Sequence, residues 1–282
     1  MSVPPVYNNH FPKVGSKVSN LYMVARIAVA TLLICWSGMG AAQVAAKFYL
    51  EKTNYAVGEP IFLYFEAINE GPAPQKLYSA DPNSDCSAFH IHFSNDHPVA
   101  SCARGISCLS SSIWLEPGEK HVERILLNLA HNVNFPADYS VDADVAANFA
   151  YGSKITVKPG MLHFQVDPRV PEPEVFQPLL DQLRSGYLLK RIEAARALAS
   201  VAPRSLEGTL LSFADDRDLR QFAPLALHRL NTQASTKAMV DLVNKAALGS
   251  FEHWRAAAYL ANDACADAPW WNLDITHAAP RK

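Results

Sequence analysis

The spacing of hydrophobic residues along the chain changes at Asp167. Before this residue apolar and polar positions alternate, as in Tyr139–Val145 and Leu162–Val166. After it, apolar residues recur every three or four positions. Alternation is typical of strands with one buried face, and a spacing of about 3.6 residues is typical of amphipathic helices. The pattern therefore predicts a β part followed by an α-helical part.

Four segments follow from this pattern. We expect an N-terminal extension at residues 1–42, a β domain at 43–167, a Pro- and Glu-rich linker at 168–174, and a helical domain at 175–282. A chain of 282 residues with 49% hydrophobic content can bury two cores. Few contacts are expected to cross the linker, which would make it the most protease-sensitive internal site.

Turn-forming residues divide the β part into about seven or eight short strands, a number typical of a β-sandwich. The expected strands are 47–50, 61–68, 89–93, 112–115, 119–129 and 139–145, with two more between 154 and 166. The run 61–68 is apolar on both faces, so we expect it to be a central strand.

Three Ala- and Leu-rich segments of the helical part can be aligned with one another. They are 191–198, 223–230 and 253–260, and two further amphipathic helices, 206–213 and 236–247, lie between them. A repeat of about 30 residues with two helices per unit predicts a short α-solenoid. After Ala264 the pattern stops, so either Trp270 and Trp271 pack over the last repeat or the reading frame is truncated.

The N-terminal segment has the layout of a secretory signal. Arg26 precedes the uncharged run 27–40, and small residues follow, which predicts cleavage between Ala42 and Gln43. Met23 is an alternative start that would give an ordinary n-region. If residues 21–44 are not cleaved, they form a membrane anchor. In either case the two domains are expected on the extracytoplasmic side, periplasmic or secreted.

The cysteine residues agree with an oxidising compartment. Three of the five, Cys86, Cys102 and Cys108, fall in one short stretch of the β part. We prefer a disulfide between Cys102 and Cys108, and a bond from Cys86 to either of them is the alternative. Their spacing does not fit a zinc site.

Four motifs of the β part describe turns and strand starts: Tyr55–Ile61, Ile68–Gly71, Leu115–Glu119 and Phe135–Val141. Together they resemble bacterial extracytoplasmic immunoglobulin-like domains. The resemblance implies an immunoglobulin-like β-sandwich and a tyrosine corner, in which the Tyr139 hydroxyl bonds to upstream backbone. Domains of this kind bind partners or act as spacers between other domains, and the resemblance implies no catalytic residue.

The helical part resembles HEAT-type repeats, in which alanine lets helices approach closely and leucine fills the seam. The loop Ala214–Asp218 resembles the turn between the two helices of that family, where aspartate caps the second helix. Pro224 departs from the family because it lies too far from such a cap, so we expect it to kink the helix.

His90 and His92 are the weak candidates for a metal site. They lie on one face of an expected strand, and Asp96, His97 or His121 are possible third ligands. The simpler interpretation places Phe89, Ile91 and Phe93 in the core and both histidines in solvent. We therefore predict no metal and no cofactor.

Other polar groups are better explained as turns or solvated surface than as metal or catalytic sites. Asp81–Asp85 begins like a calcium loop, but Cys86 and His92 stand where that loop needs Gly and Glu. Ser110–Ser112 lacks the context of a serine nucleophile. A basic set is expected on the solvated side of the helices, although a concave solenoid surface can use it for an acidic partner; it consists of Arg184, Lys190, Arg191, Arg196 and Arg204.

These observations predict a non-catalytic, exported protein-interaction or scaffolding protein of the bacterial envelope. Its partner is another protein, and its membrane contact is only through the N-terminal segment. The net charge is −2 and there is no block of Lys or Arg, which argues against nucleic acid. A secreted protease inhibitor with an inserted Cys102–Cys108 loop and a metal-dependent enzyme using His90 and His92 are the alternatives.

Overall fold

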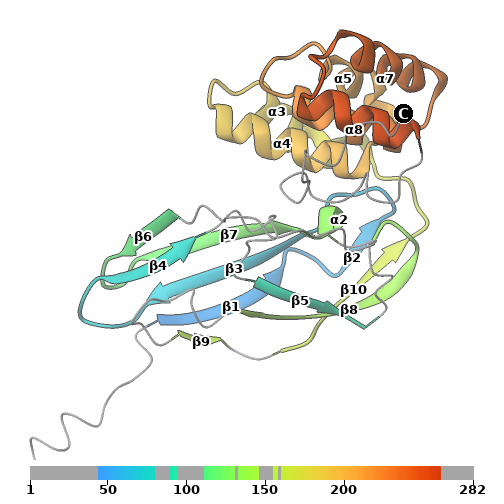
Figure 1. The fold of residues 1–282 in the computed structure, drawn as a ribbon. Coiled ribbons are helices and arrows are strands. Elements are labelled where there is room, and N and C mark those ends of the chain that lie inside the picture. Colours follow the sequence, from blue (N-terminus) through green and yellow to red (C-terminus); the bar gives the residue numbers. More distant parts are fainter. Residues whose placement is uncertain are drawn as a thin grey trace, which may run out of the picture. The chain divides into compact units, whose positions relative to one another are not determined.

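The computed structural model describes residues 44–79, 89–94, 111–130, 133–145, 155–157 and 160–261 (Figure 1). Strands occupy the N-terminal part and helices the C-terminal part, and the last strand ends at Asp167. The change of spacing at this residue therefore marks the change of secondary structure, as predicted. All described residues belong to one compact unit, Ala42–Lys282.

The described part of the chain contains ten strands in three sheets. One four-stranded sheet has the order β7-β3-β1-β9, the other has the order β2-β10-β8-β5, and β4 pairs with β6. Only β1–β9 and β2–β10 among the pairs of described strands are parallel. The strands are β1 (Val44–Leu50), β2 (Asn54–Ala56), β3 (Phe62–Asn69), β4 (Gln75–Ser79), β5 (Phe89–Phe93), β6 (Ser111–Leu115), β7 (Lys120–Leu126), β8 (Ala137–Val145), β9 (Ile155–Val157) and β10 (Leu162–Asp167).

The two four-stranded sheets contribute to one hydrophobic core. The Phe65 ring on β3 lies 5.2 Å from Phe48 of the same sheet and 4.9 Å from Phe89 of the other, measured between ring centroids. β3 lies between β7 and β1, with residues buried on both of its faces. The prediction of a central strand from the largely apolar run 61–68 is therefore confirmed.

Two turns of the β part have the same construction. Gly58 and Gly118 both have a positive φ, +81° and +79°, which favours glycine at the third position of a tight turn. In each turn the following glutamate closes the loop on itself: Glu59 accepts from the Ala56 amide at 3.0 Å, and Glu119 from the Glu116 amide at 2.8 Å. This bond explains why both motifs read Gly-Glu.

The predicted tyrosine corner is present. The Tyr139 hydroxyl, near the start of β8, donates to the carbonyl oxygen of Phe135 at 3.0 Å. The Tyr139 ring is 6% exposed and stacks on Phe164 of β10 at 5.2 Å. Burial raises the pKa of the Tyr139 hydroxyl, because the charged phenolate would lose its hydration.

The remaining elements of the described chain are helices. They are α2 (Leu127–Ala130), η2 (Pro173–Phe176), α3 (Gln177–Leu183), α4 (Leu188–Val201), η3 (Arg204–Leu206), α5 (Glu207–Ser212), η4 (Arg220–Phe222), α6 (Ala223–Leu230), α7 (Gln233–Lys245) and α8 (Phe251–Leu260). Each of the five predicted helical segments corresponds to a helix. The expected strand 119–129 ends early, because the chain turns into α2 after Leu126.

The larger helices pair in sequence order. α3 packs against α4, α5 against α6, and α7 against α8, while α4 contacts α6 and α6 contacts α8. The expected kink at Pro224 is wrong, because α6 begins at Ala223 after a short 3₁₀ turn. The proline therefore lies in the first helical turn, where its missing N–H costs nothing.

α4 and α6 end in the left-handed conformation. Asn231 adopts φ 47° at the end of α6, a conformation that asparagine tolerates. Ala202 adopts φ 41° at the end of α4 and is 5% exposed. Alanine is an unusual residue at such a position.

Packing continues from the β part into the helices. Leu126, the last residue of β7, is 2% exposed and belongs to the core formed by the helices, and Phe62 and Leu129 pack against that core. The carbonyl oxygen of Asn128 in α2 accepts from Arg229 of α6 at 3.4 Å. The two parts thus share buried side chains, although the domain boundaries themselves stay predictions.

Candidate functional site

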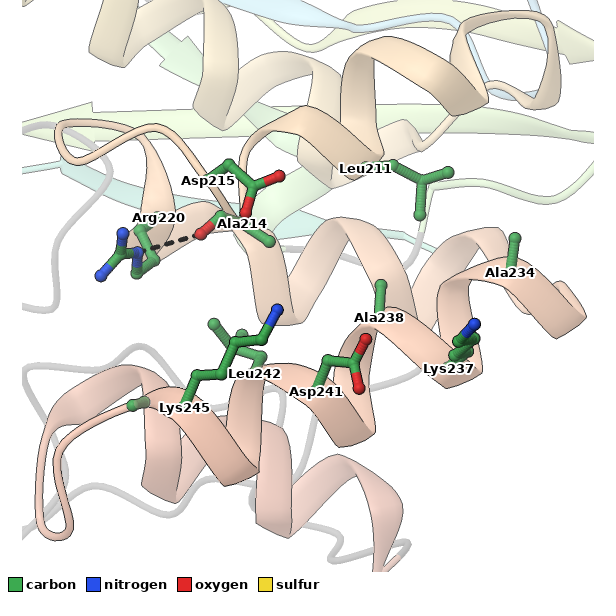
Figure 2. Close-up of a pocket in the computed structure, with 11 residues that line it drawn as sticks. Leu211, Ala214, Asp215, Arg220, Ala234, Lys237, Ala238, Asp241, Leu242 and Lys245 are labelled. Atoms are coloured by element: carbon green, nitrogen blue, oxygen red, sulfur yellow. Dashed lines mark hydrogen bonds between the residues drawn. The ribbon is translucent and has the colours of Figure 1, made fainter.

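A cavity of about 380 Å³ lies between α5, the loop that follows it, and α7 (Figure 2). Its lining combines an apolar floor with charged side chains. The apolar residues are Leu211, Ala214, Ala234, Ala238, Leu242 and Ala246, and the charged residues are Asp215, Arg220, Lys237, Asp241 and Lys245. We call this feature the α5–α7 groove.

The sequence of α7 explains the floor of the groove. Ala234, Ala238 and Leu242 are four positions apart, which places them on one face of α7, and Ala246 follows directly after the end of the helix. Three of these four residues are alanines, whose short side chains leave room for the cavity. A capping box fixes the start of the helix, because Thr232 and Ser235 each accept a hydrogen bond from the backbone amide of the other, at 3.1 and 2.9 Å.

A second row on α7 carries alternating charge. Lys237, Asp241 and Lys245 are also four positions apart, and Asp215 lies on the facing wall (Figure 2). Within the described residues, none of these four side chains takes part in an ion pair. The groove therefore offers both cations and carboxylates to a bound molecule, beside an apolar surface.

The wall opposite α7 is held in place by hydrogen bonds. Nε of Arg220 donates to the carbonyl oxygen of Ala214 at 3.0 Å, the bond drawn in Figure 2. Arg191 of α4 reaches the same loop, with Nη2 2.5 Å from the Asp216 carboxylate and Nη1 2.9 Å from that of Asp218. These bonds tie the groove to the neighbouring helix pair.

Two expectations about this loop need correction. Arg191 was expected on the solvated side of its helix, but its side chain is only 24% exposed and bridges to Asp216 and Asp218. Asp216 does not cap α6: its carboxylate accepts from the amides of Asp218 and Leu219, at 2.9 and 3.3 Å, ahead of that helix. Asp216 therefore stabilises the loop and does not cap α6.

The histidine pair lies as the simpler interpretation predicts. On β5, Phe89 is buried while His90 and His92 are exposed. Nδ1 of His90 lies 3.0 Å from the Asp144 carboxylate on β8, and His121 lies on β7 of the other sheet, 2.9 Å from Glu123. Among the described residues no group of three or more His, Cys, Asp or Glu side chains is placed to hold a metal.

Several predicted residues lie outside the part that the structure describes. They are the cleavage site Ala42 and Gln43, the cysteines Cys86, Cys102 and Cys108, the ligand candidates Asp96 and His97, the Asp81–Asp85 loop, Ser110, and Trp270 and Trp271. No described helix is long and apolar enough to cross a bilayer.

The α5–α7 groove was missed from the sequence. Its signals are the four-residue spacings on α7, one of small residues and one of alternating charge. Such spacing identifies a face of a helix, but it does not tell whether a neighbouring helix covers that face. In the structure α5 and α7 do not pack closely together, so the face stays open.

Comparisons with known proteins give no family. No family model and no curated protein matches the sequence. Among solved structures, the CARDB domain of a Pyrococcus furiosus protein aligns with 45% of this chain and 96% of its own, at 9% identity and a TM-score of 0.24. A β-glucosidase from Listeria innocua aligns at 12% identity with a TM-score of 0.24. The alkylpurine DNA glycosylase AlkC from Pseudomonas fluorescens aligns at 18% identity with a TM-score of 0.24.

The alignments with the β-glucosidase and the DNA glycosylase are partial on both sides. They cover 46% and 45% of this chain, but only 17% and 31% of the respective enzymes. TM-scores of this size do not establish a common fold.

Proposed function

We propose that the protein is a non-catalytic binding protein of the bacterial envelope, exported across the cytoplasmic membrane, in which a short helical solenoid binds another protein. The observation that carries this proposal is the α5–α7 groove. An apolar floor flanked by unpaired charges is suited to binding a peptide segment. The apolar part provides affinity, and the charges fix the position of the peptide along the groove.

An immunoglobulin-like sandwich is the fold we propose for the β part. In that fold strands A, B and E lie side by side in one sheet and C, F and G in the other. Assigning β1, β3 and β7 to A, B and E, and β5, β8 and β10 to C, F and G, reproduces both orders. The tyrosine corner at the start of β8 agrees with its assignment as strand F.

A HEAT-like solenoid is the corresponding proposal for the helical part. Support comes from the order of packing: α4, α6 and α8, the second helices of the three pairs, contact one another in succession. Solenoids use an extended surface formed by successive repeats to bind partners. The α5–α7 groove lies between the first helices of two successive pairs, which makes it the surface to test.

Site-specific photo-crosslinking in the full chain tests this function. A photoreactive amino acid replaces Ala238 on the floor of the groove, and the control replaces Val240, which is 42% exposed on the same helix and does not line the cavity. In the cells that produce the protein, we expect a discrete protein adduct from position 238 only. Reversing two charges, Lys237→Glu with Lys245→Glu, should remove that adduct. Absence of an adduct, or the same adducts from both positions, would contradict the proposal.

A further inference from the structure

The chain continues beyond α8, close to one end of the α5–α7 groove. The structure describes this part as far as Ala261, and residues 262–282 follow. α7 and α8 pack against each other, and Nδ1 of His253, near the start of α8, lies 2.9 Å from the carbonyl oxygen of Val243, near the end of α7. α8 therefore runs back along α7 and ends beside the N-terminal half of that helix.

The residues after α8 can reach the groove from there. Between Leu260 and Asp267 an extended chain spans up to about 23 Å, at about 3.3 Å per residue. A helix with its side chains is only about 10–12 Å thick. The chain is thus long enough to pass around the start of α7 and to enter the groove beside Ala234 and Lys237, which line it at that end.

The groove and the 262–275 segment have opposite net charge. The charged residues that line the groove are three cations and two carboxylates, a sum of +1: Arg220, Lys237 and Lys245 against Asp215 and Asp241. The 262–275 segment contains three aspartates and no lysine or arginine, a sum of −3. Lys237 and Lys245 are about 12 Å apart along α7. Neither pairs with a carboxylate among the residues that the structure describes.

The order of residues in the segment matches the order of features in the groove. Four residues have the spacing i, i+3, i+4, i+7, which places them on one face of a helix: Asp267, Trp270, Trp271 and Asp274. The two aspartates would then be about 10 Å apart. An aspartate followed two residues later by proline is also a typical helix start. This face carries two indoles between two carboxylates, whereas α7 carries an apolar floor between two lysines.

We propose that residues 267–274 of the chain itself bind in the α5–α7 groove as a short helix. The indoles of Trp270 and Trp271 lie on the apolar floor, and the two aspartates pair with Lys237 and Lys245. Each indole buries about 150–250 Å² in such a contact. A short tether also gives the segment a millimolar effective concentration, which favours it over an untethered peptide of equal affinity.

This inference rests on the proposed function and adds a means of regulating it. The groove that is proposed to bind a partner protein is closed until the partner displaces residues 267–274. The segment is therefore an intramolecular competitor, and the partner's apparent affinity is lowered by the fraction of chains in which the groove is filled.

Photo-crosslinking within the purified full chain tests the inference in the absence of any partner. A photoreactive amino acid replaces Ala238 on the floor of the groove, and the control replaces Val240, which does not line the cavity. Protease digestion and mass spectrometry of the monomeric product should join position 238, and not position 240, to a peptide that contains Trp270 and Trp271. The double variant Trp270→Ser/Trp271→Ser should lose this cross-link.

A charge exchange separates specific docking from a general effect on folding. Lys237→Glu/Lys245→Glu should also lose the cross-link, and adding Asp267→Lys/Asp274→Lys to the same chain should restore it. Both lysines are exposed on α7, so we expect these variants to keep their helix content, which circular dichroism measures.

Four results would overturn the inference. They are the absence of a cross-link from position 238 to residues 262–275, equal cross-links from positions 238 and 240, failure of the charge exchange to restore a lost cross-link, and a product of doubled mass, in which a second copy fills the groove. Because the purified chain contains no partner, these results leave the adduct expected in cells unaffected. Absence of that adduct would in turn contradict the proposed function and leave the internal cross-link in place.

Discussion

Replacing Leu126 tests whether the β part and the helices unfold together. This residue ends β7, yet its side chain is 2% exposed within the core of the helical part. Leu126→Ala leaves the strand pairing with Phe62 intact and removes the buried branched end of the side chain. The perturbation therefore acts on the packing between the two parts.

The size of the effect follows from burial. Leucine-to-alanine substitutions at buried positions cost about 2–5 kcal/mol, the sum of lost transfer energy and the cavity left behind. A middle value of about 3 kcal/mol lowers the Tm of a protein of this size by roughly 6–12 °C. Val122→Ala is the matched control on the same face of β7. Since Val122 is 40% exposed, its loss should change stability by only about 0.5 kcal/mol.

Differential scanning calorimetry measures both the shift and the cooperativity. We expect one heat-absorption peak for the native chain and two separated peaks for Leu126→Ala, because the coupling is weakened more than either core. Leu198→Ala, at a fully buried site within the helical core, should lower Tm without splitting the peak. If Leu126→Ala shifts Tm no more than Val122→Ala does, the helices do not pack on this strand and the reasoning is refuted.

Two further substitutions test the β part. Tyr139→Phe removes the hydroxyl that donates to Phe135 and should reduce the free energy of unfolding in urea by about 1 kcal/mol; an unchanged midpoint would contradict a structural role for the corner. Hydrogen bonds from Lys120 and then from Lys47 outweigh burial and lower the pKa of Glu66. Its carboxylate therefore stabilises the fold above the unfolded pKa of about 4.3, and this contribution is lost as pH falls through the lower folded value. Glu66→Gln should accordingly melt below the native protein at neutral pH, with a difference that shrinks under acid; a difference independent of pH would refute the ionic role.

Features set by neighbouring residues could be predicted from the sequence. Alternation alone places Phe89 in the core and His90 in solvent, because successive side chains of a strand point to opposite faces. The turns at Gly58 and Gly118 are local in the same sense, since their geometry requires the positive φ that glycine adopts.

The end of the expected strand 119–129 shows where local pattern is insufficient. Leu126, Leu127 and Leu129 are all apolar, and in the structure they serve two different cores. The turn into α2 directs Leu127 to the β core, while Leu126 and Leu129 meet the helices. In a strand Leu127 and Leu129 would point to the same face, so a strand could not send them to different cores. The position of the second core depends on residues that are distant in the sequence.

The candidate site depended on the same long-range information. The sequence predicts an amphipathic helix at 236–247 that contains Lys237, Asp241 and Lys245, and α7 confirms it. Whether their face is covered depends on the distance between α5 and α7, which no local pattern specifies. The error at Pro224 has a related origin: the start of α6 was placed at the aspartates of the preceding loop, whose partner is Arg191 on a different helix.

The left-handed alanine at the end of α4 has a consequence for substitution at this position. Holding Ala202 at φ 41° costs about 1–2 kcal/mol relative to a right-handed residue. Glycine would relieve that strain, but it would give up about 0.8 kcal/mol from the buried methyl group and a further 0.5–1 kcal/mol of chain entropy. The opposing contributions cancel to within about 1 kcal/mol. Alanine and glycine at position 202 are therefore both compatible with the same helix end, and neither has a large advantage in stability over the other.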